Sequence, residues 1–133
     1  MRILRTGLSL IFLAVAGVVL VYPALYNGFI LTTADTGGYL AAAVPGTAAP
    51  GVAPLYGYLL AKLQLNGTWW PLVVAQGALV LWLLHLVRRS HGLSGSAGGL
   101  VLTTAFLVAL TGVAWVTTLA TPDLFVPVLV LAL

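Results

Sequence analysis

Apolar residues occur in four long runs, and polar or helix-breaking residues separate these runs. The runs cover residues 8–26, 69–87, 99–117 and 124–133. Each of the first three approaches the roughly 20 residues that a helix needs to cross a bilayer. The pattern predicts an all-α, polytopic membrane protein with three complete transmembrane helices. The fourth run is cut short at Leu133, so we expect the chain to be the N-terminal piece of a longer protein.

The first run begins behind two basic residues, Arg2 and Arg5, and this arrangement is shared with secretory signal peptides. Its apolar core is longer than the roughly 15 residues of a signal peptide, and no clean small-x-small cleavage site follows. We therefore expect residues 8–26 to remain attached as a membrane anchor.

Residues 27–68 form the predicted outside loop, and glycines and prolines interrupt it repeatedly. Between these breaks, residues 35–44 and 55–65 are candidates for short helices. Both are too short to span a membrane and are expected to lie along its surface. Thr33 is the predicted N-cap of the first, which would put Asp35 in the first helical turn, where the helix dipole favours an anion.

The composition limits the class of protein. Hydrophobic residues make up 62% of the chain and charged residues 5%, whereas soluble domains carry about 25% charged residues. Too few charges remain to solvate a globular surface, so most of the surface must contact lipid. The net charge of +3 comes from residues at the ends of apolar runs, and no nucleic-acid partner is expected. The absence of cysteine excludes disulfides and thiolate metal sites.

The basic residues predict the orientation. If the three spans alternate, one side of the membrane holds four of the five basic residues: Arg2, Arg5, Arg88 and Arg89. Positive residues favour the cytoplasmic side, so the N-terminus is expected there. The two acidic residues of the chain, Asp35 and Asp123, then lie together on the extracytoplasmic face.

Two interpretations of these carboxylates stay open. Asp35 stands in a turn-forming Asp-Thr-Gly-Gly segment, and Asp123 follows Pro122 in a helix-start pattern, so either can be purely structural. Alternatively, one carboxylate acts as a general base on a hydroxyl, while the second orients it, binds an acceptor or holds a divalent cation. Two oxygen ligands alone make no strong metal site, so no metal ligands are assigned.

Three segments carry a family resemblance: residues 34–40 (ADTGGYL), 54–60 (PLYGYLL) and 121–125 (TPDLF). The first two segments resemble parts of the first luminal loop of the GT-C glycosyltransferases. The third resembles the Pro-Asp step between the third and fourth spans of bacterial members. The resemblance implies transfer of a sugar from a polyprenyl-phosphate donor to an acceptor, on the outer face of a bacterial inner (plasma) membrane. It would make Asp35 the base and Asp123 the second acidic residue of the site.

Four further residues are candidates for substrate binding: Tyr39, Tyr56, Tyr58 and Lys62. The tyrosines fall in the resembling segments and could line a sugar site, although anchoring at the membrane surface explains them equally well. Lys62 is the only cation expected outside, where it would meet a lipid phosphate or extend along the interface.

Two other classes remain as alternatives. Four helices without a soluble domain also fit a small non-enzymatic membrane subunit or scaffold, which would have membrane proteins as partners. A transporter fragment is a weaker fit, because transporters place polar groups near the middle of the membrane and these runs hold few of them. In every interpretation, membrane lipid surrounds the chain.

Overall fold

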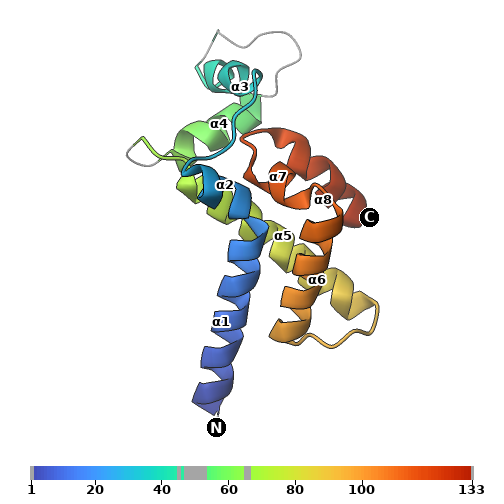
Figure 1. Ribbon diagram of the computed structural model, residues 1–133. Helices are drawn as coiled ribbons and strands as arrows, with labels where there is room; N and C mark the ends of the chain where they lie inside the picture. The colour runs from blue at the N-terminus through green and yellow to red at the C-terminus, as the bar shows by residue number, and fades with distance from the viewer. Residues whose placement is uncertain (1, 45, 47–53, 65–66, 133) are drawn as a thin grey trace.

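The computed structural model describes residues 2–44, 46, 54–64 and 67–132 (Figure 1). Within these residues the regular elements are all helical, and an isolated parallel bridge joins Leu31 and Leu119. The predicted all-α class is therefore confirmed. The elements are α1 (Arg2–Leu20), α2 (Tyr22–Asn27), α3 (Thr36–Ala42), α4 (Pro54–Leu63), α5 (Trp70–Ser90), α6 (Ala97–Leu110), α7 (Val113–Thr118), the 3-10 turn η1 (Pro122–Leu124) and α8 (Phe125–Ala132).

The three longest helices alternate in direction. In Figure 1, α1 rises from the N-terminus, α5 descends and α6 rises again. The short helices α3 and α4 lie at the end of the molecule opposite the N-terminus. The C-terminal end of α5, with Arg88 and Arg89, therefore points toward the same end as the start of α1.

The prediction of three complete spans is not confirmed. Within the described part of the chain, α5 is the one helix that is both long and apolar enough to cross a membrane. Two other apolar helical stretches, Gly7–Leu20 and Ala97–Leu110, fall short in length. The structure thus differs from the sequence pattern in the first and third runs, where a continuous apolar sequence does not give a continuous helix.

The first run is divided near Pro23. The backbone of Val21 leaves the helical region (φ −101°, ψ 14°), and α2 begins again with a proline in its first turn. Proline fits a first turn because its missing N–H would have no partner there, whereas inside a longer helix it would remove a hydrogen bond. One run of apolar sequence therefore becomes the two helices α1 and α2.

The third run is divided at Thr111, whose backbone is extended (φ −135°, ψ 169°). Its hydroxyl donates to the Leu107 carbonyl at 2.6 Å and accepts from the Val113 N–H at 3.2 Å. Threonine side chains can bond to nearby backbone groups in this way and compete with the helical pattern. Gly112 follows directly and adds backbone freedom, so α7 starts as a separate helix.

The two short helices predicted within residues 27–68 are present as α3 and α4, but the start of α3 differs from the prediction. The helix begins at Thr36, with Asp35 immediately before it and outside its first turn. Thr33 does not cap the helix with its side chain; instead, its own N–H donates to the Thr36 hydroxyl at 3.0 Å. The Asp35 side chain makes no capping hydrogen bond and is exposed.

Helices α3 and α4 pack closely because Gly57 lies at their contact. An added Cβ at Gly57 would overlap the carbonyl oxygen of Tyr39 and lie 3.0 Å from the backbone nitrogen of Ala43. Buried residues of α2, α4, α5 and the two bridged segments continue this packing into one apolar cluster: Ala24, Ile30, Tyr56, Leu60, Leu72, Val73 and Ala120. The loop helices are therefore fixed to the body of the molecule.

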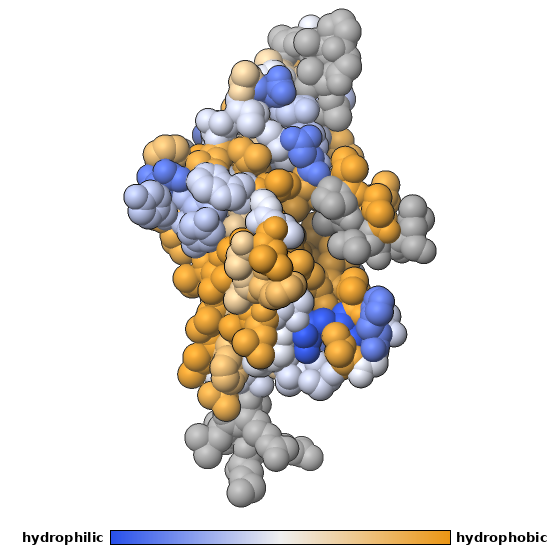
Figure 2. All heavy atoms as spheres, turned by 45° about the vertical axis from the view of Figure 1, so that its right-hand side comes forward, coloured by the Kyte–Doolittle hydropathy of each residue, from blue (hydrophilic) through white to orange (hydrophobic). Residues whose placement is uncertain are grey.

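The outside of the helical body is largely apolar. Figure 2 shows hydrophobic side chains over the middle of the visible face, with hydrophilic residues gathered toward its ends. On α6, for example, Leu102 is 74% exposed and Phe106 is 65% exposed. Such a band is typical of a surface that contacts hydrocarbon.

Candidate functional site

The segment before α3 and the segment before η1 lie side by side. The N–H of Leu31 donates to the Thr118 carbonyl at 3.1 Å, and the N–H of Ala120 donates to the Leu31 carbonyl at 2.9 Å. These two bonds form the parallel bridge between Leu31 and Leu119. Residues that are far apart in sequence are thereby held in a fixed register.

A hydrogen bond from a side chain joins the same two segments a few residues further along the chain. The hydroxyl of Thr36, which is 3% exposed, donates to the Ala120 carbonyl at 3.2 Å. Thr36 directly follows Asp35, and Ala120 lies just before the η1 turn that contains Asp123. The structure therefore joins the two acid-bearing segments, and both carboxylates are on exposed residues that a ligand can reach.

Contacts between aromatic rings link α3 to α4 and α4 to α8. Tyr39 and Tyr56 meet edge to face with 5.3 Å between ring centroids, and Tyr56 meets Phe125 in the same manner at 6.0 Å. Edge-to-face pairs of this kind each add about 0.5–1.5 kcal/mol beyond the area they bury. Two of the candidate tyrosines, Tyr39 and Tyr56, are thus brought together next to the turn that carries Asp123.

Tyr56 is a buried residue of this site and is only 4% exposed. Burial raises the pKa of its hydroxyl well above the usual value. The neighbouring Gln76 side chain acts in the opposite direction, while Tyr39 and Asp123 raise the pKa further. Tyr56 therefore remains a neutral hydrogen-bond donor across the physiological pH range.

Gln76 comes from the middle of the apolar sequence of α5 and is 2% exposed. Its Nε2 donates to the Leu119 carbonyl at 3.3 Å, which leaves Oε1 as a buried acceptor without a partner among the described residues. The Tyr56 hydroxyl is also buried and unpartnered there. The two side chains are close enough for a hydrogen-bond interaction with Gln76 to lower the Tyr56 pKa, although the pair falls short of a well-formed hydrogen bond.

The other two candidates, Tyr58 and Lys62, do not join this group. The buried face of α4 carries Tyr56, Gly57 and Leu60. With 3.6 residues per turn, Tyr58 and Lys62 lie on the opposite side of the same helix, and both are exposed. Four of the six candidates from the sequence therefore belong to the joined segments and the helices beside them: Asp35, Tyr39, Tyr56 and Asp123. The other two, Tyr58 and Lys62, lie on the exposed face of α4.

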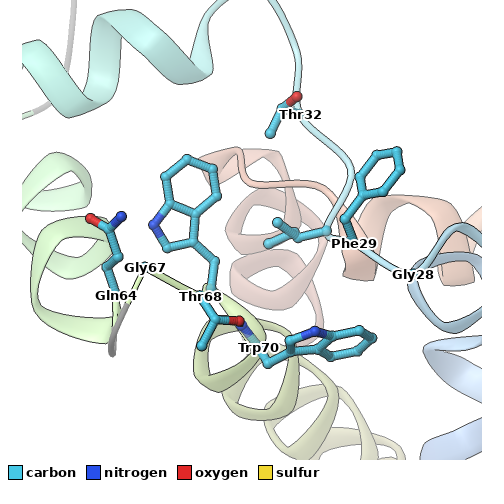
Figure 3. A pocket seen from close by; sticks show the side chains of 9 residues that line it. Gly28, Phe29, Thr32, Gln64, Gly67, Thr68 and Trp70 are labelled. Atoms are coloured by element: carbon cyan, nitrogen blue, oxygen red, sulfur yellow. The ribbon is translucent and has the colours of Figure 1, made fainter.

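A cavity of about 370 Å³ lies beside this region, between the end of α2 and the start of α5 (Figure 3). Gln64 and Thr68 border it on one side and Phe29 and Thr32 on the other. Trp69 also lines it, and the Nε1 atom of that indole is buried without a partner among the described residues. In the sequence, Trp69 and Trp70 stand at the start of an apolar run, a pattern that is typical of residues at a membrane interface and does not indicate a cavity.

Metal binding has little support in the arrangement of side chains. In the part of the chain that the structure describes, no group of three or more His, Asp or Glu residues is placed to hold a metal ion. Exposed Asp35 and Asp123 alone would provide too few ligands for a tight divalent site. We therefore assign no metal ligand.

No protein-family model, curated protein or solved structure matches this chain. Three features of the chain's own geometry bear on its function: the bridged segments, the Tyr56–Gln76 pair and the exposed carboxylates.

Proposed function

We propose that this chain is the N-terminal membrane portion of a GT-C type glycosyltransferase. It would move a sugar from a polyprenyl-phosphate donor to an acceptor on the extracytoplasmic face of a bacterial inner membrane. The single observation that supports this most is the connection between the Asp35 and Asp123 segments through the Leu31–Leu119 bridge and the Thr36–Ala120 hydrogen bond. A transfer site needs two such groups held in a fixed relation.

The proposed membrane arrangement follows the direction of the helices. Helix α5 crosses the bilayer, and the pairs α1–α2 and α6–α7 cross it as broken helices. Arg88 and Arg89 stand at the end of α5 that points toward the N-terminus of the chain (Figure 1). The positive residues therefore favour a cytoplasmic N-terminus, with α3 and α4 outside.

The proposed chemistry uses one carboxylate as a base. Asp35 accepts the proton of an acceptor hydroxyl as its oxygen attacks the anomeric carbon of the donor sugar. The bond between that carbon and the phosphate oxygen breaks, and polyprenyl phosphate leaves with the electron pair. Asp123 accepts a hydrogen bond from a second hydroxyl and orients the acceptor.

The proposal is tested with the natural full-length polypeptide, purified in lipid nanodiscs and supplied with a polyprenyl-phosphate sugar. Removing a general base typically lowers a rate by about 100-fold or more. We expect such a loss in kcat for Asp35→Asn, with partial recovery in Asp35→Glu. Asp123→Asn should chiefly raise the KM for the acceptor.

Arg89→Gln provides the control, because Arg89 is an exposed charge at the opposite end of α5. It should leave transfer unchanged. Normal turnover in Asp35→Asn would overturn the assignment of the base. Absence of transfer by the wild-type protein with any polyprenyl-phosphate sugar would instead favour the non-enzymatic subunit.

A further inference from the structure

Three cavities follow one another along α5. The first is the cavity of Figure 3, of about 370 Å³, which we call the polar cavity, and Trp70 is part of its wall. The second, of about 360 Å³, lies between α1 and α5 and also includes Trp70. The third, of about 320 Å³, shares Ala78 and Leu81 with the second and reaches His85. The second and third together are called the apolar groove, and Trp70 stands where it meets the polar cavity.

The polar cavity offers hydrogen-bonding groups that a ligand can reach. Gln64 and Thr32 are exposed residues, and Figure 3 shows the Gln64 amide and the Thr32 hydroxyl on opposite sides of the cavity. The Thr68 hydroxyl accepts from the N–H of Trp70 at 3.4 Å, which leaves its hydrogen for another acceptor. Among the described residues, none that lines this cavity is charged. The cavity therefore combines neutral donors and acceptors.

These groups favour an uncharged head group that is rich in hydroxyls. A sugar hydroxyl can donate to the carbonyl oxygen of Gln64 or accept from its NH₂ group. Aromatic rings have a negative face, which attracts the partly positive hydrogens on the C–H face of a sugar ring, and Phe29, Trp69 and Trp70 supply such rings. A phosphate or ammonium group would leave water for a cavity without an opposite charge in its wall, and that transfer is costly.

The apolar groove has the length and the wall that a hydrocarbon chain requires. Small and aliphatic side chains of both helices line its first part, among them Ala14, Gly17, Val18, Gly77, Ala78 and Leu81. From Trp70 to His85, α5 rises by about 22 Å at 1.5 Å per residue. A lipid chain covers about half of the roughly 30 Å hydrocarbon core. One acyl chain therefore fits along the groove.

We propose that the polar cavity and the apolar groove together bind a neutral glycolipid, with its sugar in the polar cavity and one acyl chain between α1 and α5. Tryptophans are enriched at the level of the lipid head groups, and Trp69 and Trp70 lie where the sugar would be. The inference depends on the proposed crossing of the bilayer by α5 but not on sugar transfer. The ligand also differs from the proposed sugar donor, because that donor carries a phosphate and this cavity has no cation for it.

The test uses the full-length protein in phosphatidylcholine nanodiscs that contain a monoglucosyl diacylglycerol with a photoreactive diazirine on one acyl chain. We expect labelled peptides from α1 and α5. Unlabelled monoglucosyl diacylglycerol should suppress the labelling at lower mole fractions than diacylglycerol, which lacks the sugar, or phosphatidylglycerol, which is anionic. The Gln64→Leu variant keeps a side chain of similar size and loses the amide. In this variant the glucosyl lipid should compete about twofold to tenfold less well, as expected for one lost hydrogen bond, and diacylglycerol should be unaffected.

A second variant tests the groove. Ala78→Phe places a ring where the two parts of the groove meet, so labelling of α1 and α5 should fall. Ala75→Phe is the matched control and should be labelled like the wild type, because Ala75 is also an exposed alanine of α5 but lines neither the polar cavity nor the groove.

Three results would overturn the proposal. Equal competition by diacylglycerol would show that the polar cavity takes no sugar. Equal competition by phosphatidylglycerol would show that the neutral wall does not select against charge. Labelling that is the same in Ala78→Phe and Ala75→Phe, or that falls outside α1 and α5, would show that the groove holds no acyl chain. None of these results bears on sugar transfer, which is measured separately.

Discussion

The hydroxyl of Thr36 donates a 3.2 Å hydrogen bond to the carbonyl oxygen of Ala120, 84 residues further along the chain. Both residues are buried, so neither group has water as an alternative partner. The same Thr36 oxygen accepts from the N–H of Thr33 at 3.0 Å. One side chain therefore connects the start of α3 with the segment that leads to Asp123.

Thr36→Val should weaken this connection without a large change in shape. The substitution leaves the buried Ala120 carbonyl without that partner, and a loss of this kind costs about 1–3 kcal/mol. We expect the free energy of unfolding to fall by about that amount in a denaturant titration of the protein in mild detergent. Thr32→Val, at an exposed position nearby, should change it by less than about 0.5 kcal/mol.

Gly57→Ala should separate α3 from α4. The new methyl group would overlap the Tyr39 carbonyl oxygen, and a backbone atom cannot rotate away as a side chain can. Overpacking in a fitted core typically costs about 1–3 kcal/mol. We expect a loss of this size, with increased protease cleavage in α3 and α4.

Gly38→Ala is the matched control for that experiment. Gly38 lies inside α3, and an added Cβ there would have no heavy atom within 4 Å. Alanine favours a helix over glycine by about 0.5–1 kcal/mol. Gly38→Ala should therefore leave stability unchanged or raise it, and equal loss in both variants would contradict the close contact at Gly57.

The stability of the protein should fall at high pH partly because of Tyr56. Its pKa is raised in the folded state by burial, whereas the unfolded chain has the ordinary tyrosine value of about 10. Above about pH 10 the unfolded state releases this proton and the folded state retains it, so stability decreases as pH rises. Tyr56→Phe should show a shallower decline than wild type between about pH 10 and 11.5, and identical slopes would contradict the buried, neutral hydroxyl.

The membrane orientation can be mapped with single cysteines, because the natural sequence contains none. Ala34→Cys lies just before α3 and Leu93→Cys just after α5, and both positions are exposed. A membrane-impermeant maleimide should label Ala34→Cys in intact spheroplasts and Leu93→Cys only after permeabilisation. Labelling of both from outside would contradict a bilayer crossing by α5.

The site was only partly predictable. Asp35, Tyr39, Tyr56 and Asp123 stood out in sequence because acids and tyrosines are conspicuous in a mostly apolar chain. Their association depends on a backbone bridge and a threonine hydroxyl, and such long-range pairing leaves no local pattern. Gln76 had no signal beyond being polar within an apolar run, because its role comes from the Leu119 carbonyl opposite it.

The sequence by itself determined the helical class, the apolar exterior and the approximate positions of the short helices, because hydrophobic runs and Gly or Pro breaks act locally. Only the tertiary structure decided where the long runs divide: at Val21 before α2, and at Thr111 before α7. It also decided that Tyr56 turns inward while Tyr58 stays exposed. The physical reason is that these outcomes depend on packing between distant segments and on which neighbour satisfies each buried polar group.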